Sequence, residues 1–227
     1  MNVALRNLLA AWCLDALAAR EAEPRVEALA AFARAADASG VAVVSEEHCR
    51  ALAESPFFER TTAGGLRLQS DVARDVGAVR ERAARFVVAL AAARAACGIA
   101  DHSPPSLDWT LRAAAALFNA RLFFEVHELL EGAWKPAGGS LRTFLQGLIQ
   151  IAVGFHHLEN DNSRGAVSLL AEGFAKLQRF GPEAYGVELA EFCAATERIR
   201  ERLAAAASSD VEPPRLSVRQ SPSDRTR

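Results

Sequence analysis

Hydrophobic residues recur at helical spacing along most of the chain, and this periodicity predicts an all-α protein. The pattern is clearest in the second half, where five amphipathic segments are separated by short polar or Gly/Pro-rich turns. Short connections of this kind join antiparallel neighbours, so they predict an antiparallel helical bundle. The predicted helices span residues 108–118, 122–134, 140–158, 164–180 and 183–206.

The first 100 residues are less regular, and their pattern indicates a mostly helical accessory region. Turn signals divide it into short elements at Pro24, Gly40, Pro56 and Gly64-Gly65. The segments between these turns predict a helix over residues 25–38, a capped helix start at Ser45–His48, a hairpin over residues 57–69 that turns at Gly64-Gly65, and a long helix over residues 72–96.

The order of helix, short helix and hairpin is the outline of a small winged-helix module, which would bind DNA. Two features argue against this interpretation. A second helix is hard to fit before Pro56, and the hairpin carries only Arg60 and Arg67 as cations. We therefore favour a small helical accessory domain, and nucleic-acid binding through residues 1–100 is the alternative.

The segment 98–106, which contains Pro104-Pro105, ends the long helix and marks the predicted domain boundary. The end of the chain is rich in Ser, Pro, Arg and Asp and offers few apolar positions, which predicts a disordered tail. The chain is thus expected to contain an N-terminal accessory region (1–100), a helical-bundle domain (105–206) and a disordered tail (207–227).

Composition excludes several classes of protein. Hydrophobic residues make up 51% and charged residues 24% of the chain, the balance of an ordinary soluble globular protein. The net charge of −2 gives no long-range attraction to phosphate backbones. No apolar run reaches the roughly 20 residues of a membrane span, so no membrane partner is expected. Homo-oligomerisation stays open.

The cysteines and the N-terminus bear on location. Cys13, Cys49, Cys97 and Cys193 are widely spaced, which argues against a zinc ribbon or a disulfide framework. The apolar stretch of the first 20 residues contains Asp15 and continues as an amphipathic helix, unlike a signal peptide. These features predict a cytoplasmic protein with free thiols.

The helix over residues 122–134 carries the densest group of polar side chains. Glu125, His127, Glu128 and Glu131 lie within two turns, and no basic residue occurs between Arg121 and Lys135. On a helical wheel the carboxylates and the imidazole share one side. Carboxylates without cationic partners repel one another unless a metal ion, a protonated histidine or a donor network relieves them.

The helix over residues 140–158 offers a complementary polar stripe. Gln146, Gln150 and His157 lie on one face of an otherwise apolar helix. Gly147 and Gly154 lie on an adjacent strip, where they would let a neighbouring helix approach closely. If the two stripes meet, the bundle contains an interior Glu/His/Gln cluster.

Four strings along the bundle resemble the domain of unknown function 309 family. They are FNARLFFEVHELLE at residues 118–131, closing at Trp134, then LQGLIQIA at residues 145–152, His156-His157, and the block that contains Asn162, Gly165, Ala166 and Leu169-Leu170. The resemblance covers residues 107–180; Ala120 stands where the family often has Gly. It implies a small helical bundle with the Glu and His side chains facing inward, implies no established activity, and says nothing of residues 1–100.

The sharper functional hypothesis is a metal-dependent enzyme of hydrolase type. His127 and Glu131 have the i, i+4 spacing that lets two ligands on one helix share an ion, and His157 would complete a set of two histidines and one carboxylate. Glu128 or Glu125 would then act as the base for a metal-bound water. The metal would be zinc, manganese or iron.

The alternative is a non-catalytic binding or scaffold domain, in which the cluster only fixes the packing of an Ala/Leu-rich bundle. A third interpretation is a metal-free ligand or acid–base site. In it Gln146, Gln150, Trp134 and Asn119 would contact the ligand. His48 and His102 stand alone and are expected to be surface or capping residues.

Overall fold

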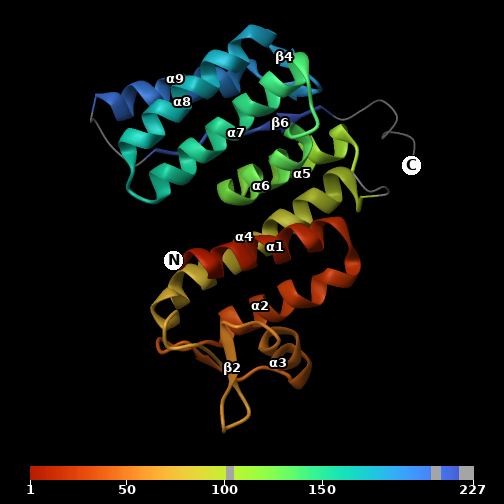
Figure 1. Cartoon of the computed structure of the whole chain (residues 1–227), viewed down its shortest axis with the longest axis vertical. Coiled ribbons are helices and arrows are strands. Elements are labelled where there is room, and N and C mark those ends of the chain that lie inside the picture. The colour runs from red at the N-terminus through yellow and green to blue at the C-terminus, as the bar shows by residue number, and fades with distance from the viewer. Residues whose placement is uncertain (101–104, 206–210, 220–227) are drawn as a thin grey trace. The chain divides into compact units, whose positions relative to one another are not determined.

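The computed structural model describes residues 1–100, 105–205 and 211–219. These residues form mainly α-helices with two small antiparallel sheets, which confirms the all-α class (Figure 1). The chain divides into two compact units, Met1–Arg94 and Ala95–Arg227. The predicted boundary at residues 98–106 remains a prediction, and His102 lies outside the described residues. Within the described ranges, no helix has the length and apolar character that crossing a membrane requires.

The N-terminal unit combines helices with a three-stranded sheet of order β1-β3-β2. Its core gathers aromatic side chains from several elements, and the ring of Phe58 lies edge-on to that of Phe32 at 5.0 Å. The elements are α1 Val3–Ala18, η1 Arg20–Ala22, α2 Glu23–Ala35, β1 Val41–Ala42, α3 Glu46–Ala53, β2 Phe58–Arg60, β3 Leu66–Leu68, η2 Ala73–Asp75 and α4 Val76–Cys97.

Local signals in this unit are confirmed. The Ser45 side chain accepts a hydrogen bond from the backbone N–H of His48 and caps α3. The predicted hairpin forms from β2 and β3, and Gly64 at its turn has a φ of 83°. A Cβ on Gly65 would lie 2.5 Å from the carbonyl oxygen of Ala42 on β1, so only glycine fits there.

The C-terminal unit is the predicted helical bundle. Helix α7 packs against both α6 and α8, and α8 also packs against α9. A second small sheet has the order β4-β5-β6. The elements are α5 Leu107–Asn119, α6 Phe123–Trp134, α7 Gly139–Glu159, α8 Ser163–Leu177, η3 Gln178–Phe180, β4 Glu183–Ala184, β5 Val187–Glu188, α9 Ala190–Ala204 and β6 Ser217–Val218.

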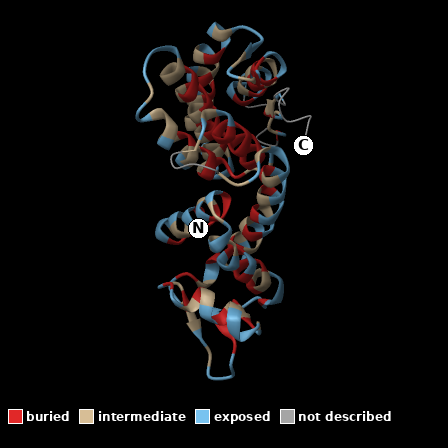
Figure 2. Cartoon of the chain, turned by 90° about the vertical axis from the view of Figure 1, so that its right-hand side faces the viewer, coloured by how far each residue is buried: buried red, intermediate tan, exposed pale blue. Residues whose placement is uncertain are grey.

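A phenylalanine cluster holds the bundle together. Figure 2 shows buried residues concentrated inside the unit. Phe118 on α5 is 2% exposed. Its ring contacts three others edge-on, with centroids 5.1 Å from Phe123, 5.8 Å from Phe155 and 5.4 Å from Phe192. These rings come from α6, α7 and α9, so one side chain links four helices.

Glycines set the close approach of α7 and α8. A Cβ on Gly147 would lie 2.8 Å from the Leu177 side chain, and one on Gly154 would lie 2.9 Å from Leu170. On α8, a Cβ on Gly173 would lie 2.8 Å from the carbonyl oxygen of Gly147. The expectation that Gly147 and Gly154 admit a neighbouring helix is confirmed.

Two expectations for the end of the chain were wrong. The fifth helix begins at Ala190, not at residue 183, because Tyr185 and Gly186 adopt positive φ in a two-residue turn between β4 and β5. Residues 211–219, expected in a disordered tail, instead pack on the bundle and pair with β5. The other residues of that predicted tail, 207–210 and 220–227, lie outside the described residues.

Candidate functional site

The polar group on α6 is only partly interior. A tight turn starts the helix: the Leu122 N–H donates to the carbonyl of Leu117, and Arg121 takes the positive φ of 60°. Glu125 then faces the core and is fully buried. His127, Glu128 and Glu131 lie at positions reached by solvent, so the inward orientation implied for this group holds for Glu125 alone. The rest of the predicted cluster lies nearer the surface.

His127 and Glu131 contact different partners. The His127 Nδ1 lies 3.1 Å from a carboxylate oxygen of its neighbour Glu128. The Glu131 carboxylate lies 3.2 Å from the Lys135 ammonium, one helical turn further on. The predicted i, i+4 pair therefore shares a helix face, but each member is engaged locally.

His157 serves the turn between α7 and α8. The Nδ1 of His157 lies 2.7 Å from Nδ2, the side-chain amide nitrogen of Asn162. The Asn162 Oδ1 accepts the Gly165 N–H and caps α8, so its NH₂ group is the one that faces the imidazole. In this arrangement the Asn162 NH₂ group donates to the Nδ1 of His157.

The three predicted metal ligands are not brought together. Within residues 1–100, 105–205 and 211–219, no group of three or more His, Cys, Asp or Glu side chains is placed to hold a metal ion. His127, Glu131 and His157 thus form no common ligand set. The helical wheel placed His127 and Glu131 on one side correctly, but it could not show that adjacent residues engage them.

The predicted ligand-binding residues are spread over three helices, α5, α6 and α7. Gln150 on α7 donates from Nε2 to Glu172 on α8 at 2.6 Å. The Trp134 ring lies under the Arg142 guanidinium, 3.8 Å from the ring centroid. The Gln150 Oε1 and the Trp134 Nε1 are buried and find no hydrogen-bond partner among the described residues. Gln146 on α7 is partly exposed.

Asn119 has a role that sequence reasoning missed. Its Oδ1 accepts the backbone N–H of Leu216 at 2.9 Å, and its Nδ2 donates to the Leu216 carbonyl at 2.8 Å. The side chain therefore holds the main chain of the C-terminal segment, which we define as residues 211–219. Asn119 is polar and ends α5, but its partner lay in a stretch expected to be disordered.

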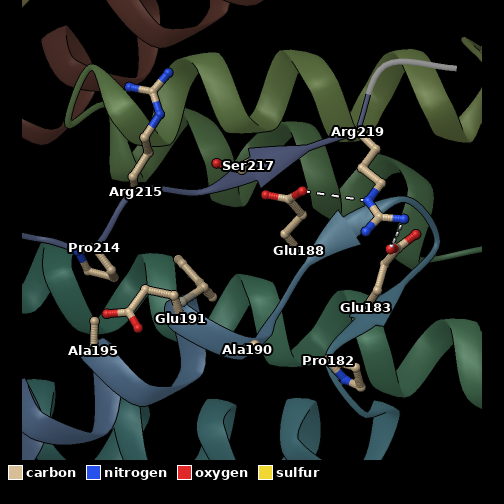
Figure 3. A pocket seen from close by; sticks show the side chains of 11 residues that line it. Pro182, Glu183, Glu188, Ala190, Glu191, Ala195, Pro214, Arg215, Ser217 and Arg219 are labelled. Atoms are coloured by element: carbon tan, nitrogen blue, oxygen red, sulfur yellow. Dashed lines mark ion pairs between the residues drawn. The ribbon is translucent and has the colours of Figure 1, made fainter.

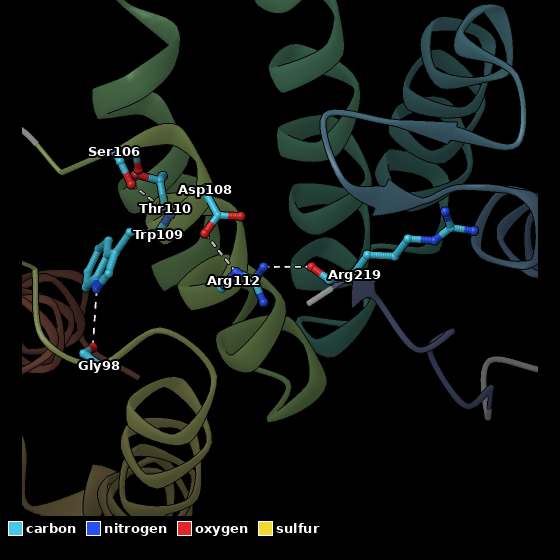
Figure 4. Close-up of polar contacts among 7 residues, drawn as sticks. All are labelled: Gly98, Ser106, Asp108, Trp109, Thr110, Arg112 and Arg219. Atoms are coloured by element: carbon cyan, nitrogen blue, oxygen red, sulfur yellow. Dashed lines mark hydrogen bonds and ion pairs between the residues drawn. The ribbon is translucent and has the colours of Figure 1, made fainter. Parts of the chain in front are cut away.

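A buried arginine holds the same segment. Arg112 on α5 is 4% exposed, and it donates from Nε to Asp108 at 2.8 Å and from Nη2 to the carbonyl of Arg219 at 2.7 Å (Figure 4). One turn earlier, the Trp109 indole donates to the carbonyl of Gly98. Helix α5 thus presents two side chains, Arg112 and Asn119, to the backbone of the C-terminal segment.

A cavity of about 600 Å³ lies beside the C-terminal segment. Its walls come from β4, β5, the start of α9 and the segment itself, as Figure 3 shows. The carboxylates of Glu183, Glu188 and Glu191 line it together with Arg215 and Arg219. The Arg219 guanidinium lies 2.7 Å from Glu183 and 3.6 Å from Glu188. This mixed-charge hollow was not predicted from the sequence.

The hairpin of the N-terminal unit lacks the features of a DNA-binding wing. Only turn residues lie between α3 and β2, so the second helix of a helix-turn-helix is missing there. Arg60 donates to both carboxylate oxygens of Glu46, at 2.8 and 2.7 Å, and the side chain of Arg67 contacts Glu59 at 2.5 Å. Both predicted cations already face carboxylates of their own surface.

Two of the four cysteines, Cys97 and Cys193, are poor nucleophiles. Burial raises the pKa of Cys97 and of Cys193 to about 11, from an ordinary value of 9.0. Near neutral pH both thiols therefore stay protonated, and the thiolate is the reactive form. The raised pKa values therefore give no support for a reactive thiol at Cys97 or Cys193.

Comparison with known proteins confirms the resemblance seen in the bundle. Residues 111–169 match the model of a family described as a domain of unknown function (DUF309). The match runs from α5 through α6 and α7 into α8, and it includes Asn119, His127 and His157. The search of curated proteins and the search of solved structures found no match.

Proposed function

We propose that the C-terminal unit, in which residues 111–169 match the DUF309 family model, is a non-catalytic binding domain. In this proposal the Glu, His and Gln side chains fix the packing of the bundle and do no chemistry. One observation supports this proposal most strongly: the three candidate ligands contact separate partners. His127 contacts Glu128, Glu131 contacts Lys135, and His157 contacts Asn162.

These contacts fit a structural role in their energetics. The pairs on α6 are partly exposed, and such pairs contribute about 0–1 kcal/mol each. The contact of His157 with Asn162 joins α7 to the cap of α8. Gln150 with Glu172 links the same two helices further along. The contacts of His157 and Gln150 therefore tie α7 to α8, as expected of groups that specify packing, whereas the pairs on α6 are local to that helix.

The competing function is the metal-dependent hydrolase, with zinc, manganese or iron held by His127, Glu131 and His157. It would require all three side chains to leave their present partners and converge on one ion. Glu128 would have to leave His127 to act as a base, and Glu125 would act from a fully buried position. No other observation favours this rearrangement.

Thermal unfolding with and without a chelator separates the two functions. We expect EDTA to leave the melting temperature unchanged in the wild type and in His127→Ala and His157→Ala. Each substitution should cost at most about 1 kcal/mol, because each removes one local contact. His156→Ala on the same helix is the matched control for His157→Ala. A melting temperature that EDTA lowers in the wild type, but not in His157→Ala, would establish a metal site.

The proposal also covers the rest of the protein. The N-terminal unit serves as an accessory domain, since Arg60 and Arg67 are engaged by carboxylates and offer little to a phosphate backbone. A cytoplasmic location agrees with the four cysteines, all of which are free thiols.

A further inference from the structure

We propose that the groove occupied by the C-terminal segment is a binding site for an extended peptide of a partner protein, and that residues 211–219 fill it in cis. This inference rests on the proposed function and names the partner of that binding domain. The chemistry of the groove defines the partner as an extended strand with two buried aliphatic side chains, at the positions of Val211 and Leu216, the second followed three residues later by a basic one.

The polar side chains of the groove form hydrogen bonds with main-chain atoms of the C-terminal segment. Asn119 engages both the N–H and the C=O of Leu216, as a neighbouring strand would. Arg112 donates to the carbonyl of Arg219, and the Arg219 N–H donates to the carbonyl of Gly186 at 2.8 Å. Such contacts are available from any extended peptide, whatever its side chains.

The sheet edge gives the peptide its direction. Strand β6 pairs antiparallel with β5, with Val187 opposite Val218 and Glu188 opposite Ser217. Without β6, β5 would present an unpaired edge on this side of the sheet. Addition of a strand to such an edge is a general mode of peptide recognition.

Apolar and charged side chains supply specificity. Val211 and Leu216 are 6% and 3% exposed and act as apolar anchors, and Leu216 lies next to the main-chain contacts made by Asn119. Three residues on, Arg219 lies between Glu183 and Glu188. Glu191 also lines the cavity, so its acidic side has room for a second cation.

The attached segment should compete with a peptide added in trans. A tethered ligand has an effective concentration on the order of millimolar, so a free peptide is excluded until the attached segment is released. Leu216→Asp is the releasing substitution, because it places a charge in a buried anchor position.

The test measures fluorescence anisotropy of a labelled peptide with the sequence of residues 211–219, added to full-length protein. We expect the Leu216→Asp chain to bind it at least about tenfold more tightly than the wild type. Adding Asn119→Ala to the released chain should weaken binding by about tenfold or more, since both main-chain hydrogen bonds are lost. A peptide that itself carries Leu216→Asp is the matched control and should not bind.

A second releasing variant keeps the test decisive if Leu216→Asp does not fold. The Arg219 side chain is exposed, so Arg219→Glu preserves the core while it sets a carboxylate against Glu183 and Glu188. This chain should bind the unmodified peptide more tightly than the wild type does. If a releasing variant folds but does not bind the labelled peptide, the proposal is wrong. In that case the melting temperature of the wild type would still not change with EDTA. Failure of the peptide-binding proposal can therefore be distinguished from failure of the binding-domain assignment.

Discussion

Replacing Gly173 by alanine is expected to destabilise the protein by about 2 kcal/mol. The new Cβ would lie 2.6 Å from the Ile151 side chain and 2.8 Å from the backbone oxygen of Gly147. The backbone oxygen cannot move without α7, so the two helices must separate along their closest contact. Overpacking of this kind costs about 1–3 kcal/mol or more, which outweighs the gain in helix propensity.

Gly132→Ala on α6 is the matched control. No atom lies within 4 Å of the position that its Cβ would take, so the substitution should stabilise the protein by up to about 1 kcal/mol. Urea unfolding of the two variants measures the contrast directly. If Gly173→Ala were as stable as Gly132→Ala, the close approach of α7 and α8 would be wrong.

Phe118→Ala is expected to cost about 3–5 kcal/mol, the largest effect of any substitution considered. The fully packed ring contacts Phe123, Phe155 and Phe192 on three other helices. Its removal leaves a cavity that four helices cannot close together, and it also ends the edge-on ring contacts. The melting temperature should fall far enough to be visible by circular dichroism.

Phe124→Ala provides the comparison for that substitution. Phe124 has the same size and lies on α6, but it is partly exposed and lies beside His127 and His156. Its loss should cost less than half as much, because part of the ring is already in contact with water. Equal losses for the two variants would mean that the phenylalanine cluster is not the centre of the bundle.

Much of the bundle could be predicted because its signals are local. Helical spacing and turn residues gave the extents of α5 to α8 within a few residues. In the N-terminal unit, Ser45 indicated the cap of α3 from side-chain chemistry alone. Gly147 and Gly154 indicated a close helix contact for the same reason. Strands of two residues, as in β4 and β5, are too short to show an alternation of apolar and polar residues. Both strands were therefore included in the helix expected from residue 183.

The C-terminal segment escaped prediction because its stabilising contacts are distant in sequence. Asn119 lies 97 residues from Leu216, and Arg112 lies 107 residues from Arg219. A local composition rich in Pro, Ser and Arg gives no sign of such partners. The apolar residues at 216 and 218, two positions apart, were the one signal of a short strand.

The polar residues of α6 and α7 could be assigned to their helices from the sequence, but their contacts could not. Helical geometry placed the polar groups of α6 and α7 correctly on their helices. It could not show that Glu128 and Lys135 would engage His127 and Glu131, or that Asn162 would engage His157. Those choices depend on rotamers and on the turn after α7.

The metal content of the purified, tag-free protein tests the binding-domain assignment most directly. Inductively coupled plasma mass spectrometry of the wild type and of His157→Ala would measure zinc, manganese and iron per chain. We predict no near-stoichiometric metal in either protein, because the three candidate ligands are engaged separately. Close to one ion per chain in the wild type, lost in His157→Ala, would contradict the assignment and make this a metal-dependent site.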